Sequence, residues 1–196
     1  RLVGSEMCIR DRDADSLRER IRQAPEKFSN AGSRGAYRYH TLSAHQSITD
    51  VAITSPSAGI VAIYLLTKDG NPTEEIIKIV QNYLSDDKIR PLTDCVKVYS
   101  SEKVDFEIKA KIYLYKDSDA DSVMKTIEAK MKEYKISLSE KLGKDVIQTQ
   151  IISILNSVYG VFKIVLETPI TDIDILEYQW ANLQNWEISI GGYADE

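Results

Sequence analysis

Four acidic side chains between residues 117 and 128 have the spacing of a calcium-binding loop. Asp117, Asp119 and Asp121 fall at the first, third and fifth positions, and Glu128 falls at the twelfth. Ser122, however, stands where such a loop needs a glycine for its sharp turn. The segment before Asp117 also has the pattern of a strand, whereas a calcium loop follows a helix. These four residues are therefore a weak candidate for a metal site.

A helix start is the alternative interpretation of the same residues. Ser118 or Asp119 would cap the helix, and acidic side chains are favoured in a first turn by the helix dipole. We favour this interpretation, and we expect no metal or other cofactor.

The sequence "GSRG", Gly32 to Gly35, resembles the four-residue loop with which KH domains clamp a nucleic-acid backbone, and Arg34 would supply a positive charge. A nucleic-acid-binding module using this loop is therefore the alternative function. The chain is acidic, with a net charge of −5, and lacks the basic stripe and aromatic platform that such binding needs. We expect no nucleic-acid partner.

Nucleophilic catalysis has few candidate residues. His40 and His45 are five positions apart with no cysteine near them, which is poor spacing for a metal pair. We expect Cys95 to be a small apolar packing residue. No serine elbow or phosphate-binding glycine loop is visible. The sequence predicts no enzyme, although a cluster of a histidine, Cys95 and an acid in a deep pocket would revive that possibility.

Two turns are predicted to be structural. In "DKIRPLTDCV", residues 87 to 96, Pro91 ends a helix, and Arg90 and Asp94 can pair or bond free backbone groups across the turn. Gly160 is predicted at a helix C-cap with a positive φ, where a side chain would strain the backbone.

The composition is that of a soluble folded protein, with 43% hydrophobic and 28% charged residues among 196. No apolar run approaches a membrane span, and no export signal is recognisable. Residues 1–12, "RLVGSEMCIRDR", look like a translated sequencing-adapter scar, so we expect the natural N-terminus to be missing. Without Cys8, Cys95 has no disulfide partner. The remainder has a net charge of −6, which disfavours anionic membranes as partners.

Two small α+β modules in series are predicted from the hydrophobic pattern. Residues 13–47 form a helical and irregular lead-in, with an irregular connection over 28–45. The middle module, 48–101, is predicted as β-β-α-β, and its helix carries Ile76, Ile77, Val80 and Leu84 on one face.

The C-terminal module, 102–196, is predicted as β-α-α-β-β. Its strands cover 104–115, 161–168 and 185–192, and its helices cover 119–142 and 145–160. The first of these strands alternates apolar and polar residues most clearly.

Five stretches of the chain carry a resemblance to a known family: "AGSRGAYRYHTLSA", "ITDVAITSPSAGIVAIYLLTKDGNP", "IRPLTDCVKV", "GKDVIQTQIISILNSVYGVFKIVLETP" and "ISIGGYADE". Together they resemble the baseplate J-like family, which forms wedge components of contractile phage tails and related injection devices. The resemblance implies a structural subunit that joins copies of itself and other wedge proteins around the tail tube, in the virion baseplate and, during assembly, in the host cytoplasm. It places the 87–96 turn at the junction of the two modules.

Exposed tyrosines are the candidates for interface residues. Tyr37, Tyr39, Tyr113 and Tyr115, with Arg34, are of the kinds enriched at protein interfaces. Ordinary packing of these tyrosines in sheet and loop is the alternative interpretation.

Overall fold

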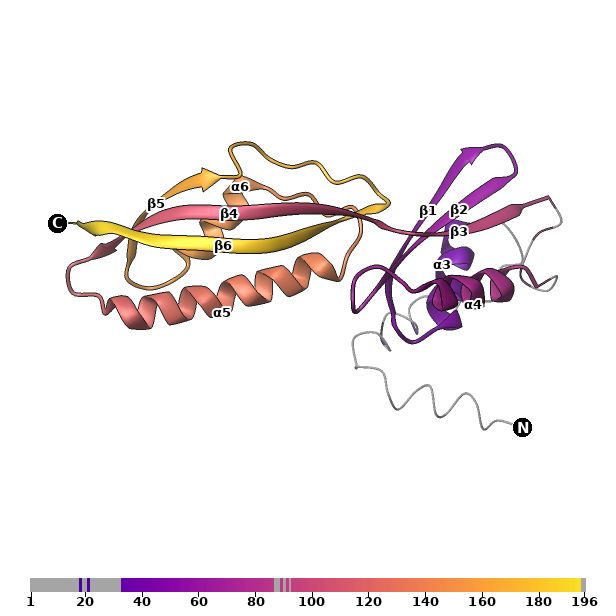
Figure 1. The fold of residues 1–196 in the computed structure, drawn as a ribbon, viewed down its shortest axis with the longest axis horizontal. Coiled ribbons are helices and arrows are strands. Elements are labelled where there is room, and N and C mark those ends of the chain that lie inside the picture. The colour runs from indigo at the N-terminus through magenta and orange to yellow at the C-terminus, as the bar shows by residue number, and fades with distance from the viewer. Residues whose placement is uncertain are drawn as a thin grey trace. The chain divides into compact units, whose positions relative to one another are not determined.

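The computed structural model describes residues 18, 21, 33–86, 89, 91 and 93–194. The chain forms two compact units, and the division falls between Ser101 and Glu102. In the described part of the chain, each unit contains a three-stranded sheet and two helices (Figure 1). The α+β class that the sequence predicted is confirmed.

The first unit follows the predicted β-β-α-β order after a preceding helix. Its elements are α3 (Arg34–Ala44), β1 (Ile48–Ser57), β2 (Ile60–Thr67), α4 (Glu74–Leu84) and β3 (Cys95–Ser100). The sheet order is β1-β2-β3. Strands β1 and β2 are antiparallel, whereas β2 and β3 are parallel, because α4 returns the chain between them.

Helix α3 lies where the sequence predicted an irregular connection, so that prediction is wrong over residues 34–44. The Ser33 hydroxyl accepts a hydrogen bond from the Ala36 N–H at 3.1 Å and caps the helix. Only Ala36, Tyr37 and Thr41 are buried. Because two of these are small or polar, the sequence shows no apolar stripe that would reveal the helix.

The core of the first unit joins both helices to the sheet. Tyr37 of α3 packs in one cluster with Val80 and Leu84 of α4. The strands contribute the other buried members: Ile48, Val51, Ile63, Leu65, Val96 and Val98. The predicted apolar face of α4 is confirmed, since Val80 and Leu84 are fully buried.

The second unit has the predicted β-α-α-β-β order. Its elements are β4 (Glu102–Tyr115), α5 (Ala120–Ser139), α6 (Gln148–Asn156), β5 (Val161–Thr168) and β6 (Gln179–Ala194). Strand β4 is central, antiparallel to β5 and parallel to β6.

Several elements of this unit differ in their bounds from the prediction, α6 and β6 most of all. Helix α6 begins only at Gln148, because the backbone of Val146 pairs with that of Ile173 at 2.9 and 3.0 Å. Strand β6 begins at Gln179, before the predicted start at 185, because Trp180 and its neighbours pair with the first residues of β4.

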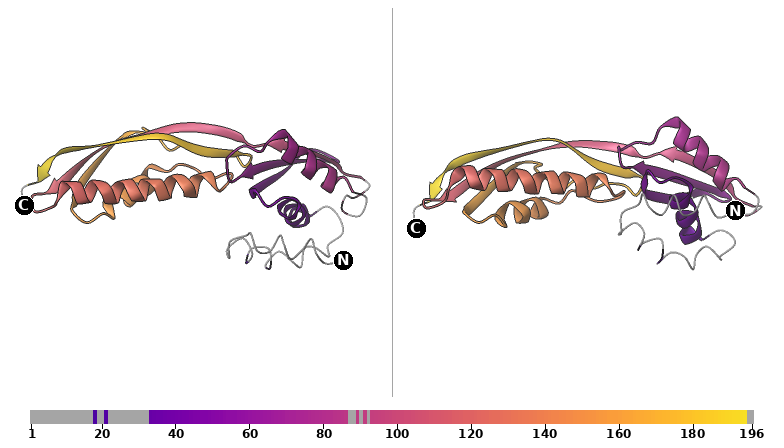
Figure 2. Two further views of the ribbon diagram at one scale, coloured as in Figure 1. Left: turned by 60° about the horizontal axis from the view of Figure 1, so that its bottom comes forward. Right: turned by 90° about the horizontal axis from the view of Figure 1, so that it is seen from below.

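Apolar packing between β4 and the helices forms the second core. Alternate β4 residues, Phe106, Ile108, Ala110, Ile112 and Leu114, are buried as predicted. They share a cluster with five residues of α5, namely Val123, Ile127, Met131, Tyr134 and Leu138, and with Ile151 and Leu155 of α6. Figure 2 shows both helices on the same face of this sheet. No described helix is long and apolar enough to cross a membrane.

Candidate interaction surfaces

The acidic residues of the calcium-like motif form a helix start. The Asp119 carboxylate accepts from the Ser122 N–H at 3.3 Å and caps α5. Glu128 lies about 10 Å further along the helix than Asp121, given the rise of about 1.5 Å per residue, and pairs with Lys132 at 2.9 Å. The four acidic residues of the weak metal candidate therefore do not come together at one site. Within the parts of the chain that the structure describes, no group of three or more His, Cys, Asp or Glu side chains could hold a metal ion.

The "GSRG" stretch also begins a helix. Gly32 lies outside the described residues, Ser33 caps α3, and Arg34 and Gly35 occupy its first turn, with Arg34 exposed. The start and cap of a helix therefore explain the residue types of this stretch, and nucleic-acid binding is not needed to explain them.

The turn before β3 is held by Asp94. Its carboxylate accepts from the Tyr37 hydroxyl at 2.8 Å and from the Thr93 hydroxyl at 3.2 Å, and its N–H donates to the Pro91 carbonyl at 3.1 Å. Asp94 therefore ties α3 to the start of β3. Arg90 lies outside the described residues, so its pairing with Asp94 stays a prediction.

Cys95 and His45, two of the candidate catalytic residues, lie far apart. Cys95 pairs with Ile60 at one end of β2, whereas His45 bonds Ser47 at 2.7 Å beside the other end, where Ile48 pairs with Thr67. An eight-residue strand is on the order of 25 Å long. His40 packs near the ring of Tyr39. Cys95 is exposed, so the prediction that it packs as an apolar residue is wrong.

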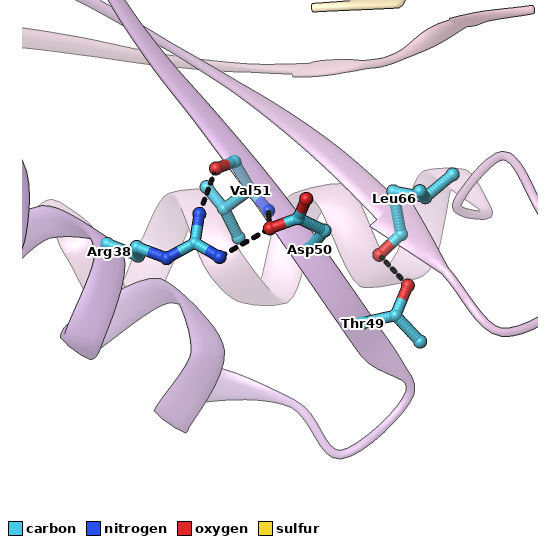
Figure 3. Close-up of polar contacts among 5 residues, drawn as sticks. All are labelled: Arg38, Thr49, Asp50, Val51 and Leu66. Atoms are coloured by element: carbon cyan, nitrogen blue, oxygen red, sulfur yellow. Dashed lines mark hydrogen bonds and ion pairs between the residues drawn. The ribbon is translucent and has the colours of Figure 1, made fainter. Parts of the chain in front are cut away.

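Arg38 makes a helix-to-strand contact that sequence reasoning missed (Figure 3). Its guanidinium donates to the Asp50 carboxylate at 2.5 Å and to the Val51 carbonyl at 2.6 Å. The same Asp50 oxygen accepts from the Val51 N–H at 2.9 Å, and the Thr49 hydroxyl donates to the Leu66 carbonyl at 3.2 Å. No sequence signal links residues 38 and 50, since α3 was not expected.

Gln81 was missed as well. Its amide nitrogen donates to the Val96 carbonyl and its amide oxygen accepts from the Val98 N–H, both at 2.9 Å. Among the described strands, β3 pairs with β2 alone, so these bonds occupy backbone groups on the other edge of β3. An occupied edge is protected from pairing with another chain.

Gly160 has the predicted positive φ, at +100°, but it is not the helix C-cap. Ser157 caps α6, and Gly160 comes three residues later, directly before β5. A Cβ at Gly160 would lie 2.8 Å from the Ser118 Oγ and 3.0 Å from Val123 Cγ2. Both the backbone and the space therefore require glycine here.

The predicted interface tyrosines divide into buried and exposed residues. Tyr37 is only 3% exposed and bonds Asp94, so it belongs to the core and the interface prediction is wrong for it. Tyr39 and Tyr113 are half-buried. The Tyr113 ring lies against Gly191, where an added Cβ would come within 2.9 Å of it. Only Tyr115 of the four is exposed.

The face of the second sheet that the helices leave uncovered carries charged side chains that pair with one another. Lys109 lies 3.6 Å from Glu187, and Lys111 lies 2.7 Å from Glu167, which raises the pKa of Lys111. A hydrogen bond from Asn182 at 2.6 Å lowers the pKa of Asp105. These charges are mutually compensated, so this face offers little to a partner.

A group of exposed aromatic residues lies at one end of the second unit. This aromatic tip consists of Tyr115, Tyr159, Phe162 and Tyr193, which are 40%, 97%, 48% and 53% exposed. Beside it, the β4–α5 turn, the α6–β5 turn and the end of β6 line an open hollow of about 740 Å³. Sequence reasoning found Tyr115 but missed the other three, because single aromatic residues near turns form no pattern.

Two family models match consecutive parts of the chain. Residues 29–100 match the Baseplate J-like central domain, and residues 106–189 match the Baseplate J-like protein C-terminal domain. The 87–96 turn therefore lies inside the central domain, and its predicted place at the junction is wrong.

Comparison with individual proteins gives the same family. The chain is 34% identical over 191 residues to baseplate protein J of Escherichia phage P2, which covers 96% of the chain and 62% of the phage protein. It also resembles a chain in the six-fold symmetrised baseplate of the anti-feeding prophage, with a TM-score of 0.57 and 13% identity over 93% of this chain and 42% of the other. At that identity the likeness concerns the fold alone.

Proposed function

Because this chain belongs to the baseplate J-like protein family, we propose that it is a structural subunit of the tail baseplate of a contractile phage or a related injection device. The observation that carries the proposal is the 34% identity to the phage P2 baseplate protein, which extends over both units. The chain spans 62% of that relative's length, so the proposal concerns the role of these two domains within the larger protein.

The finer proposal is that the chain joins copies of itself and other wedge proteins around the tail tube. It would assemble in the host cytoplasm and end in the virion baseplate. A role without catalysis is supported by the placing of Cys95 and His45 at opposite ends of β2. A role without nucleic acid is supported by the acidic net charge and by the use of Ser33 as a helix cap.

Deletion of the gene in its own tail gene cluster tests this function. We expect tail tubes without baseplates in negative-stain electron micrographs, and plasmid-borne wild type should restore the baseplates. Complete baseplates in the deletion strain would contradict the proposal. A parallel deletion of a sheath gene is the control, because it removes a tail component while leaving baseplate assembly intact.

A further inference from the structure

Strand β6 leaves one edge of the second sheet unpaired over residues 185–190. This stretch pairs regularly with β4, between two register shifts. Within the described residues, β6 pairs with β4 alone, and no other group bonds the backbone of 185–190. Alternate N–H and C=O groups of an edge strand point away from the neighbouring strand and can pair with a further strand. Figure 1 shows β6 on the side of the sheet away from β5.

The first sheet treats its edges differently, because side chains bond the backbone there. Gln81 occupies two backbone groups of β3, as described above. In β1, the Val51 N–H donates to the Asp50 carboxylate at 2.9 Å and therefore faces away from β2. Arg38 donates to the Val51 carbonyl on the same edge. The 185–190 edge of β6 has no such side chain among the described residues.

The sequence of β6 also lacks the residues that protect an edge strand. It has one charged residue, Glu187, in 16 residues and no proline. Natural edge strands are protected by lysine, by proline or by short length. Strand β5, at the other edge of the sheet, has 8 residues and carries Lys163. Strand β6 is therefore the less protected of the two edges.

The side chains of this stretch define the chemistry of an added strand. Trp186, Ile188 and Ile190 pair with buried residues of β4, so they point towards the helices. Trp186 and Ile188 are half-buried against the second core, and Ile190 is 38% exposed. An added strand with apolar residues at alternate positions would cover these three side chains. A proline in that strand would remove a hydrogen bond of the new ladder.

The helix layer has room for one strand more than the sheet contains. Helix α5 packs against β6 and α6 packs against β5. Two helices, each about 10 Å across, cover about 20 Å, whereas three strands spaced about 4.8 Å apart cover only about 14 Å. A fourth strand beside β6 would therefore still lie over α5.

The position of α5 also decides between a lone strand and a second copy of the chain. Pairing β6 with β6 of a second copy would place two α5 helices under strands that are about 4.8 Å apart, although packed helices need 8–10 Å between their axes. Every described strand of this chain already lies in a sheet that carries helices. A strand that brings no helix is therefore expected from a different polypeptide.

We propose that the 185–190 edge of β6 receives an extended segment of a different baseplate protein as a fourth strand. The segment has apolar residues at alternate positions, which lie over α5, and no proline in the paired stretch. This inference rests on the proposed function and names one interaction surface of the subunit and the chemistry of its partner.

Hydrogen exchange measured by mass spectrometry tests strand addition on the unmodified chain. Peptides that cover 185–190 are compared between the free full chain and particles assembled from its tail gene cluster. We expect exchange to be about tenfold slower or more in the particles, because an added strand bonds the outward N–H groups. Peptides of β3 are the control, since Gln81 already bonds the Val98 N–H on the outer edge. Equal exchange of 185–190 in both samples would overturn the inference.

Site-specific photocrosslinking in the same particles identifies the partner. p-Benzoylphenylalanine replaces Ser189 in the full chain, and the control carries it at Val165. Both residues pair with Lys111, so they lie in one row on the same face of the sheet, at opposite edges. We expect Ser189 to crosslink to a different polypeptide, at a peptide with alternating apolar residues and no proline. A crosslink to a second copy of this chain, or a yield no higher than at Val165, would contradict the proposed partner.

The same particles separate this inference from the proposed function. If the wild-type chain is absent from purified particles, the proposed function fails. If the chain is present and 185–190 exchanges as fast as in the free chain, only this inference fails.

Discussion

In the residues that the structure describes, both units have three strands and two helices, but different contacts hold these elements together. In the first unit, Arg38 and Gln81 reach from helices to the backbone of strands, and Tyr37 bonds Asp94. In the second unit, α5 meets β4 and β6 through a larger apolar cluster. We infer that directional polar contacts position the helices of the first unit, whereas packing positions those of the second.

This difference can be measured because both tryptophans, Trp180 and Trp186, lie in β6. Tryptophan fluorescence therefore reports the unfolding of the second unit, whereas far-ultraviolet circular dichroism reports both units. A variant can then be assigned to the unit that it destabilises.

The largest expected effect is that of Ile112→Ala. Ile112 is fully buried in β4, the central strand of its sheet, and the cavity should cost about 2–5 kcal/mol of unfolding free energy. The fluorescence transition in urea should shift, and the dichroism component of the first unit should not. Lys109→Ala, on the open face of the same strand, should have little effect. An equal shift of both signals for Ile112→Ala would show that the two units unfold together.

Gly160→Ala should be the next most damaging change. The positive φ and the 2.8 Å approach to Ser118 together predict a loss of about 2–4 kcal/mol, again seen by fluorescence. Tyr159→Ala is the matched control, because that side chain is almost fully exposed. A similar loss in the control would mean that the turn depends on Tyr159 packing and would contradict the structure.

Gln81→Ala tests the polar contacts of the first unit. Loss of two hydrogen bonds to the β3 backbone should cost about 1–2 kcal/mol. Only the dichroism signal should change, because Gln81 lies in the first unit. Asn82→Ala, at an exposed position on the same helix, should be close to neutral. If both variants behave alike in urea titrations, the Gln81 contacts contribute no stability.

Tyr134→Phe should have the smallest effect, and in the opposite direction. The buried Tyr134 hydroxyl has no hydrogen-bond partner within the described residues, so its removal should leave stability unchanged or raise it by up to about 1 kcal/mol. A marked loss of stability in this variant would show that the hydroxyl is satisfied.

The same variant predicts a pH dependence. Burial raises the pKa of Tyr134 from 10.0 to about 12. Between these values the folded state keeps a proton that the unfolded state releases, so wild-type stability falls as pH rises through this range. The melting temperature of wild type should therefore drop relative to Tyr134→Phe between pH 10 and 12. Parallel curves would contradict the burial argument.

The sequence correctly predicted the helices and strands whose buried residues recur at a regular spacing. It missed the helix that shows no such apolar pattern. The alternation along β4 and the apolar stripe of α4 arise from packing, and both were predicted correctly. Helix α3 was not, because its buried face is Ala36, Tyr37 and Thr41. That error also placed Tyr37 on the surface, since its burial depends on the helix.

The sequence predicted cap and turn residues correctly where their conformation depends on neighbouring residues of the chain. Asp119 as a cap and the positive φ of Gly160 depend on neighbouring residues and were foreseen. The contacts of Arg38 and Gln81 depend on which segments the fold brings together, and the exposure of Tyr159 depends on the buried residues on either side of it. These contacts and this exposure could not be predicted from the sequence and are visible only in the structure.

Localisation of the chain within purified tails tests the central claim most directly. An epitope tag inserted in the exposed Ala58–Gly59 turn between β1 and β2 would be detected with gold-labelled antibody in negative-stain micrographs. A structural baseplate subunit predicts gold at one end of each tail, at the baseplate, with several copies per particle by quantitative mass spectrometry. Particles with complete baseplates that carry no label, or label spread along the tail, would contradict the account.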